Sequence, residues 1–182
     1  MLFKLKWFTS AIFLSFFLKK IKFPTYFAFP VFFKGLNRVS VGKKVRVFPG
    51  CRLETHGVGE IIIEDNVSIA QNVHLTSGAK LIIGENSLIT ANVFITTIDH
   101  DYRDISMPMA EQKLLVNDTI IGKNCFIGMG AAIQAGTKLG QHCVVGANSV
   151  VRGEFPDFCV IVGSPARIVK KYNHDSGVWE RV

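Results

Sequence analysis

The chain has 182 residues, enough for one domain with a sizeable hydrophobic core. Its 21 basic and 14 acidic residues give a formal net charge of +7, which suits phosphorylated ligands, an anionic membrane surface or nucleic acid. No DNA- or RNA-reading motif accompanies that charge, so we expect no nucleic-acid partner. The four cysteines show neither a CxxC motif nor Cys/His ligand spacing. We therefore expect a reducing, cytoplasmic compartment and no metal requirement.

The first 38 residues form a segment of different composition that is apolar, aromatic and basic. Ten of the 15 phenylalanines lie before residue 34, and the uncharged stretch 7–18 is shorter than the roughly 20 residues that span a bilayer. No small-x-small signal-cleavage site follows it. Residues 1–33 suit a segment lying on the inner face of the cytoplasmic membrane, or a helix packed against its own domain or a neighbouring subunit. Pro24 and Pro30 argue against a helix that continues past residue 23.

From residue 39 onward, aliphatic residues recur every six positions. A period of six is neither the 3.6 of a helix nor the 2.0 of a strand, and hexapeptide periods indicate a β-helix. The repeats form five sets of three: Val41, Val47 and Leu53; Ile63, Ile69 and Leu75; Ile83, Ile89 and Ile95; Ile121, Ile127 and Ile133; Leu139, Val145 and Val151. The sequence therefore predicts an all-β fold, a parallel β-helix of about five to six turns over residues 39–165. Each short strand would pair with the strands one turn above and below it.

A small residue usually follows four positions after each aliphatic one. Cys51, Cys125 and Cys143 occupy this column, so we expect their thiols to be buried packing groups. Cys125 and Cys143 are eighteen positions apart, which is one turn of a three-sided coil. Their side chains are therefore expected to stack on adjacent turns.

Three insertions interrupt the repeat, and all of them follow the third member of a set. In a three-sided coil this places the extra residues at one shared corner. The longest insertion, residues 97–120, contains Asp99, His100 and Asp101. A long loop leaving a rigid scaffold is a common position for functional residues. After the coil, Pro165 suits the first turn of a helix, so we expect a short C-terminal helix and tail over residues 166–182.

The repeat, the looped His100 and the ending Ile161–Arg167 (IVGSPAR) resemble the hexapeptide acyltransferase family. Within it, the resemblance is to the galactoside, maltose, xenobiotic and polysaccharide-cluster sugar O-acetyltransferases, over residues 39–171. This resemblance implies a left-handed β-helix, acetyl-CoA as the acyl donor, direct transfer without an acyl-enzyme, and a homotrimer with its sites between subunits. Serine O-acetyltransferases share the coil, but 38 residues leave no room for their long helical N-terminal domain.

The resemblance also assigns residues. His100 corresponds to the catalytic general base, and the backbone N–H of Met129 to the donor for the thioester oxyanion. Asn72 corresponds to the acceptor-binding asparagine, although Ala70 replaces the tyrosine that often accompanies it. Coenzyme A contacts map to Gly128, Met129, Ala147, Arg152, Arg167 and Lys170, where Arg152 replaces a smaller polar residue. The remaining histidines have no motif support and are expected to be ordinary surface or strand residues: His56, His74, His142 and His174.

These residues favour an acetyl-CoA-dependent O-acetyltransferase acting on a sugar hydroxyl of a surface polysaccharide, a lipopolysaccharide or a precursor. Asp99 and Asp101 either orient the His100 imidazole or are solvated loop carboxylates. Two other enzymes share the pattern, a xenobiotic O-acetyltransferase and a nucleotide-sugar N-acetyltransferase. A non-catalytic trimeric β-helix scaffold is the alternative of a different class, and the absence of acetyl-CoA binding would identify it.

Overall fold

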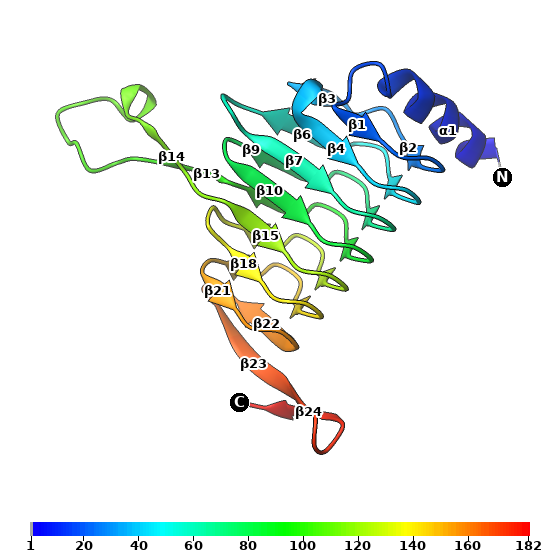
Figure 1. Ribbon diagram of the computed structural model, residues 1–182. Helices are drawn as coiled ribbons and strands as arrows, with labels where there is room; N and C mark the ends of the chain where they lie inside the picture. Colours follow the sequence, from blue (N-terminus) through cyan, green and yellow to red (C-terminus); the bar gives the residue numbers. More distant parts are fainter. Residues whose placement is uncertain (1) are drawn as a thin grey trace.

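The computed structural model describes residues 2–182 and shows a three-sided parallel β-helix with an α-helix over its N-terminal end (Figure 1). The first sheet contains β1 (Lys20–Ile21), β4 (Val39–Val41), β7 (Glu60–Ile63), β10 (Lys80–Ile83), β15 (Thr119–Ile121), β18 (Lys138–Leu139) and β21 (Glu154–Phe155). The second contains β2 (Tyr26–Phe27), β5 (Arg46–Val47), β8 (Ser68–Ile69), β11 (Leu88–Ile89), β16 (Phe126–Ile127), β19 (Val144–Val145), β22 (Cys159–Gly163), β23 (Ala166–Asn173) and β24 (Val178–Arg181). The third contains β3 (Phe32–Lys34), β6 (Arg52–Thr55), β9 (His74–Ser77), β12 (Phe94–Thr96), β17 (Ala132–Ile133) and β20 (Val150–Val151).

The predicted sets of three stack in register from turn to turn. In the first sheet Ile63 lies opposite Ile83, and Ile83 lies opposite Ile121. All fifteen aliphatic residues of the five sets are at most 3% exposed. Their side chains form one continuous core inside the coil, as the period of six predicts. The expected parallel β-helix is therefore confirmed, and its stacking is consistent with the left-handed form.

Corner residues adopt the left-handed backbone conformation that a tight three-sided turn requires. Six asparagines have φ between 55° and 62°: Asn66, Asn72, Asn86, Asn92, Asn124 and Asn148. Asparagine tolerates this conformation better than most residues because its short side chain hydrogen-bonds locally. Lys44, His142 and Phe158, with φ of 59°, 58° and 57°, adopt the same conformation at corners without asparagine.

The coil begins at Lys20 and has about seven turns. It therefore starts earlier in the chain than the predicted residue 39, and it has more turns than the predicted five to six. The additional first turn consists of β1, β2 and β3, which pair with β4, β5 and β6. Its inward position on the second sheet is Phe27, which is fully buried. Because this residue is aromatic and lies between Pro24 and Pro30, the six-residue aliphatic period of the later turns cannot be recognised in this part of the sequence. A 3₁₀ helix, η1 (Leu36–Arg38), links this turn to the next.

Helix α1 (Leu2–Leu14) closes the N-terminal end of the coil. Ala11 and Leu14, together with Leu18 just after the helix, are buried and belong to the core cluster. Of the arrangements expected for the N-terminal segment, the structure shows a helix packed against its own domain. No helix within residues 2–182 is long and apolar enough to span a membrane.

The C-terminal segment is not the predicted helix. β23 runs antiparallel to β22, and β24 pairs antiparallel with β23, so the second sheet continues past the end of the coil. The prediction used the local preference of Pro165 for a helix start. Pairing with the open edge of β22 outweighs this local preference. The unpaired backbone groups of β22 form hydrogen bonds with a strand rich in β-branched residues such as Ile168 and Val169.

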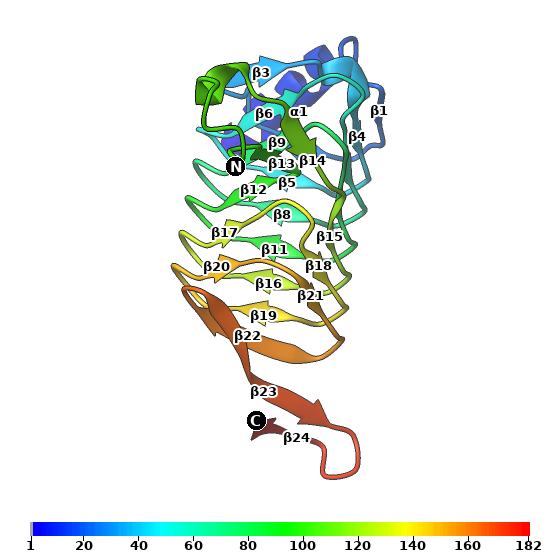
Figure 2. The same ribbon diagram turned by 90° about the vertical axis from the view of Figure 1, so that its left-hand side faces the viewer.

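The insertion after β12 forms an antiparallel hairpin that projects from the side of the coil (Figure 1). Its strands are β13 (Ile98–His100) and β14 (Leu114–Val116), and a 3₁₀ turn, η2 (Met109–Glu111), lies between them. The hairpin leaves at the corner between the third and first sheets. Figure 2 shows the successive turns stacked beside it, with β24 at the end farthest from α1.

Candidate active site

Buried threonines fasten the base of the hairpin to the coil. The Thr97 hydroxyl accepts hydrogen bonds from the backbone N–H groups of Gly78 (2.7 Å) and Ala79 (3.0 Å). The Thr119 hydroxyl donates to the carbonyl of Thr96 at 2.7 Å. Thr97 and Thr119 are fully buried, so these bonds are protected from water and define where the hairpin begins.

Gly78 also allows the hairpin to lie close to the coil. A Cβ at this position would stand 2.7 Å from Cγ1 of Val116 and 3.1 Å from Cγ1 of Ile98. The first residue of β13 and the last of β14 thus pack directly over the backbone of the preceding turn. Only glycine leaves room for this contact without a shift.

His100 ends β13 and is exposed to solvent. Its backbone N–H donates to Oδ1 of Asp99 at 2.9 Å, and Oδ2 of Asp99 lies 3.1 Å from Nη2 of Arg152, which follows β20 two coil turns farther along. Arg152 therefore holds the carboxylate that in turn fixes the backbone of His100. No side-chain partner of the His100 imidazole lies among residues 2–182, which leaves both ring nitrogens available to a ligand or another chain.

Asp101 is engaged elsewhere. Its carboxylate accepts hydrogen bonds from the guanidinium and backbone N–H of Arg103. These bonds hold the pKa of Asp101 well below its usual range. Since both oxygens of Asp101 face Arg103, it does not orient the His100 ring in this chain. A small cavity of about 170 Å³ lies at the hairpin base beside the Arg152–Asp99 pair, lined by Phe94, Thr96, Ile98, Asp99, Gln134, Ala135 and Arg152.

The other predicted site residues at the middle of the coil lie on the opposite edge of the third sheet. Asn72, Met129 and Ala147 occupy the corner between the second and third sheets, whereas the hairpin occupies the corner between the third and first. Met129 is 55% exposed, and its backbone N–H has no acceptor among the described residues. Gly128 is buried, and a Cβ there would stand 2.6 Å from the backbone nitrogen of Ala147. A single chain therefore does not bring His100 and Met129 together.

Asn72 and the two C-terminal cations have structural surroundings of their own. The Asn72 side-chain amide donates to Oδ1 of Asn92 at 3.2 Å, within a ladder of corner asparagines. Arg167 and Lys170 lie exposed on β23, and Arg167 donates to the carbonyl of Ala166 at 2.8 Å. Both cations are thus near the C-terminal end of the coil and are accessible to an anionic ligand.

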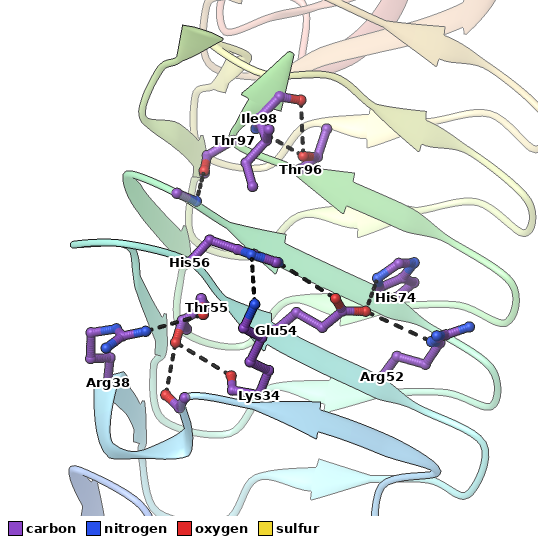
Figure 3. A network of polar contacts seen from close by, with 12 residues as sticks. Lys34, Arg38, Arg52, Glu54, Thr55, His56, His74, Thr96, Thr97 and Ile98 are labelled. Carbon is purple, nitrogen blue, oxygen red and sulfur yellow. Dashed lines mark hydrogen bonds and ion pairs between the residues drawn. The ribbon is translucent and has the colours of Figure 1, made fainter. Parts of the chain in front are cut away.

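A polar network on the outer face of the third sheet was not foreseen from the sequence (Figure 3). Glu54 is at its centre: Oε1 lies 2.9 Å from Nε2 of His74, and Oε2 lies 3.5 Å from Nε2 of His56. Arg52 Nε is 3.8 Å from the same carboxylate, and Lys34 Nζ is 3.5 Å from Nδ1 of His56. The side chain of Glu54 is only 15% exposed, so this carboxylate is well shielded by its basic neighbours.

This network could have been predicted from the length of one coil turn, which determines which residues lie side by side on the third sheet. Arg52 lies directly opposite His74 in the β6–β9 register, and both side chains point outward. The distance of twenty-two positions includes the four-residue insertion, so the pairing becomes visible only when the insertion is assigned to a corner. No cluster of three or more His, Cys, Asp or Glu side chains that could hold a metal ion occurs in the described part of the chain.

The repeat and the fold together define a hexapeptide-repeat transferase. The family model described as bacterial transferase hexapeptide (six repeats) matches residues 118–153. A protein of Escherichia coli (strain K12) named for O-acetyl transfer in lipopolysaccharide biosynthesis, WbbJ, is 36% identical over 160 residues, covering 84% of this chain and 82% of its own. The chain therefore belongs to the hexapeptide-repeat acyltransferase family, and it is an acyltransferase.

Two further comparisons are with acyltransferases. A dTDP-4-amino-4,6-dideoxy-D-glucose acyltransferase of Escherichia coli is 28% identical over 144 residues, covering 76% of this chain and 74% of its own. A variant of AntD, an N-acyltransferase from Bacillus cereus solved with dTDP and coenzyme A, superposes with a TM-score of 0.77 at 18% identity. This superposition covers 91% of this chain and 90% of AntD, and it shows a shared fold.

Proposed function

We propose that this protein transfers the acetyl group of acetyl-CoA to a sugar hydroxyl of a surface polysaccharide, a lipopolysaccharide or one of their precursors. The observation that carries the proposal is His100, held on a projecting hairpin with both imidazole nitrogens available. The 36% identity to WbbJ, which is named for lipopolysaccharide O-acetylation, supports a sugar acceptor. Residues 1–33 and the exposed apolar face of α1 support a peripheral position on the inner face of the cytoplasmic membrane.

His100 acts as the general base in this mechanism. It removes the proton of the acceptor hydroxyl while the oxygen attacks the thioester carbonyl, because an alcohol is a poor nucleophile at neutral pH. The free N–H of Met129 stabilises the oxyanion that develops on the carbonyl oxygen. The C–S bond then breaks, the acetyl group remains on the sugar oxygen, and the proton on His100 passes to the departing thiolate.

Acetyl-CoA would lie along the corner that carries Gly128, Met129 and Ala147, with Arg167 and Lys170 as partners for its phosphates. Gly128 itself lets the next turn stack closely at this corner, since a Cβ there would stand 2.6 Å from the backbone nitrogen of Ala147. Asn72, on the same corner, and the Glu54–His74 pair on the outer face of the third sheet are the groups we assign to the acceptor side.

We further propose that the active enzyme is a homotrimer. His100 and Met129 lie on opposite edges of the third sheet, so the base of one chain and the oxyanion donor of another complete a site. The hairpin also exposes apolar side chains, such as Ile105 and Leu114, which a neighbouring chain would cover. Sedimentation equilibrium should give three times the monomer mass, and a monomeric active species would refute the shared site.

The mechanism is tested by acetyl transfer from acetyl-CoA to a panel of sugars, with wild type and with His100→Ala. We expect His100→Ala to lower turnover about 10²–10⁴-fold, the usual range for a general base. Binding of coenzyme A, measured by calorimetry, should be retained, which separates a chemical defect from a folding defect. Near-normal turnover without the imidazole would rule out the assigned role.

N-acylation of a nucleotide-linked amino sugar is the second candidate, favoured by the dTDP-amino-sugar acyltransferase relative. An amine needs less base catalysis than a hydroxyl, since it is already a good nucleophile when neutral. A panel of matched hydroxyl and amino sugars therefore separates the two reactions. Strong preference for the amino sugar, with little loss in His100→Ala, would support the second candidate.

A further inference from the structure

A large cavity lies at the N-terminal end of the coil, between α1 and the outer face of the second sheet. Its volume is about 500 Å³, which falls within the usual range of small-ligand sites. Trp7 of α1 and Phe48 form an edge-to-face pair with ring centroids 4.9 Å apart, and Tyr26 completes an aromatic wall. Such a wall suits a ligand with an apolar part.

The polar lining of this cavity is cationic. Lys4, Lys44 and Arg46 line it, and no aspartate or glutamate does. Cations nearby are neutralised: Lys19 pairs with Glu60, and both Lys22 and Lys43 pair with Asp65. Among residues 2–182, by contrast, Lys4, Lys44 and Arg46 have no carboxylate partner, and the Arg46 guanidinium meets only Oδ1 of Asn66 at 3.4 Å.

Lys44 occupies a corner position where the middle turns of the coil have asparagine. It lies at the corner between the first and second sheets, where Asn66, Asn86 and Asn124 occur on the following turns, and His142 and Phe158 on the last two. A lysine in the left-handed conformation has none of the local hydrogen bonding that makes asparagine acceptable there. The first corner of this column thus gains a positive charge at the rim of the cavity, at some conformational cost.

Helix α1, which covers the cavity, and the turn that follows it present an apolar outer face. On the helix Leu5 and Phe13 are 64% and 53% exposed, and in the turn Phe16 and Phe17 are 81% and 49% exposed. Aromatic and aliphatic side chains beside lysines are typical of segments that rest in the headgroup region of a membrane. The open cavity and this apolar face therefore belong to one end of the molecule, away from the hairpin corner.

We propose that this cavity binds the phosphate headgroup of an anionic membrane phospholipid. Lys4, Lys44 and Arg46 would hold the phosphate by charge-assisted hydrogen bonds, and the aromatic wall would contact the first carbons of the acyl chains. The inference rests on the membrane contact proposed above and assigns it a specific site. It is separate from the acetyl-transfer site, which lies on other corners of the coil.

Trp7 provides a direct reporter, because Trp7 and Trp179 are the only tryptophans and Trp179→Phe removes the other signal. The full chain carrying Trp179→Phe is titrated with dihexanoyl phosphatidylglycerol below its micellar concentration, dihexanoyl phosphatidylcholine, glycerol 3-phosphate and inorganic phosphate. We expect a saturable change in Trp7 fluorescence with the anionic lipid and at least tenfold weaker responses to the other three. Equal binding of inorganic phosphate would overturn the lipid assignment, and no saturable change would overturn the site.

A matched pair of charge variants separates the site from diffuse attraction. Lys44→Gln/Arg46→Gln removes two cavity charges, and Lys6→Gln/Lys20→Gln removes two charges at the same end that do not line the cavity. Only the first pair should weaken the short-chain lipid titration at least tenfold, with unchanged thermal unfolding in both. Equal weakening by the two pairs would show a general electrostatic effect and refute the proposal.

The membrane contact and the acetyl-transfer activity are measured separately. Sedimentation with phosphatidylglycerol vesicles, compared for wild type and Phe16→Ser/Phe17→Ser, reports on the apolar face formed by α1 and the turn after it. Acetyl transfer to a water-soluble acceptor by the wild type reports on the proposed reaction. A failed activity result with an intact Trp7 titration would leave the headgroup site standing. Failure of the wild type to sediment with the vesicles would overturn the membrane phospholipid as its ligand, and a failed Trp7 titration with normal acetyl transfer would remove the site alone.

Discussion

The coil and the hairpin differ in what holds them. Inward residues of the coil are almost completely buried, and each inner strand is paired on both sides. The hairpin strands pair only with each other, and Leu114, Leu115 and Val116 remain 37–47% exposed. The stability of the molecule therefore resides in the coil, whereas the position of His100 depends on a few contacts at the hairpin base.

The largest difference should appear when the same truncation is made in both regions. Ile89→Ala opens a cavity in the fully buried core, so we expect the free energy of unfolding to fall by about 2–5 kcal/mol. Ile105→Ala, at a fully exposed position of the hairpin, should change it by no more than about 0.5 kcal/mol. Denaturant unfolding of the two variants gives both values. A comparable loss from Ile105→Ala would mean that the hairpin is part of the cooperative core.

Gly78→Ala should affect activity more than stability. The added methyl group would displace Val116 and Ile98 and thereby tilt the strand that ends in His100. A displacement of about 1 Å can cost 10²-fold in rate, so we expect at least a tenfold loss of acetyl transfer with about 1 kcal/mol of destabilisation. Adding Val116→Ala removes the nearest obstructing atom and should restore most of the activity. Full activity of the single variant would show that this contact does not position His100.

The coil was predictable from the sequence because every turn repeats the same local environment. The ungapped run 121–151 required no choice of register, and its residues stack as expected. The first turn was missed because Phe27 replaces an aliphatic residue there. The C-terminal segment was mispredicted because the signal at Pro165 is local, whereas the unpaired edge of β22 is created by the whole fold.

The site was predictable only where a motif carried it. His100 follows from its place in the long insertion and from the family resemblance. The Glu54–His74 contact and the Arg152–Asp99 pair join residues on different turns, so they depend on how many residues each corner contains. In our proposal, the site of His100 is completed by Met129 of another chain. The sequence of one chain does not show how a neighbouring chain is placed.

Arg152 and Asp99 offer a smaller and more selective test of the hairpin contacts. The pair is well exposed, so its loss should change the free energy of unfolding by less than about 1 kcal/mol. If Arg152 acts by holding the hairpin, Arg152→Gln and Asp99→Asn should each lower turnover several-fold, and the double variant should be no worse than either. If Arg152 instead contacts coenzyme A, only Arg152→Gln should raise KM for acetyl-CoA. A double-mutant cycle on kcat and KM decides between these roles.

The smallest expected effect is the influence of pH on the buried thiols of the coil. Their reactivity tests whether the interior of the coil is more rigid than the exposed hairpin. Cys51, Cys125, Cys143 and Cys159 are free and buried, and burial raises the pKa of Cys51 to about 11 from 9.0. Because the folded state favours the protonated thiol, this contribution to stability is present below about pH 9 and is lost as the pH rises through about 11. At pH 8 we expect negligible labelling by a thiol-specific disulfide reagent in the native state and four reactive thiols after denaturation. Rapid native labelling at pH 8 would show that the coil opens locally and would remove the contrast in rigidity between coil and hairpin.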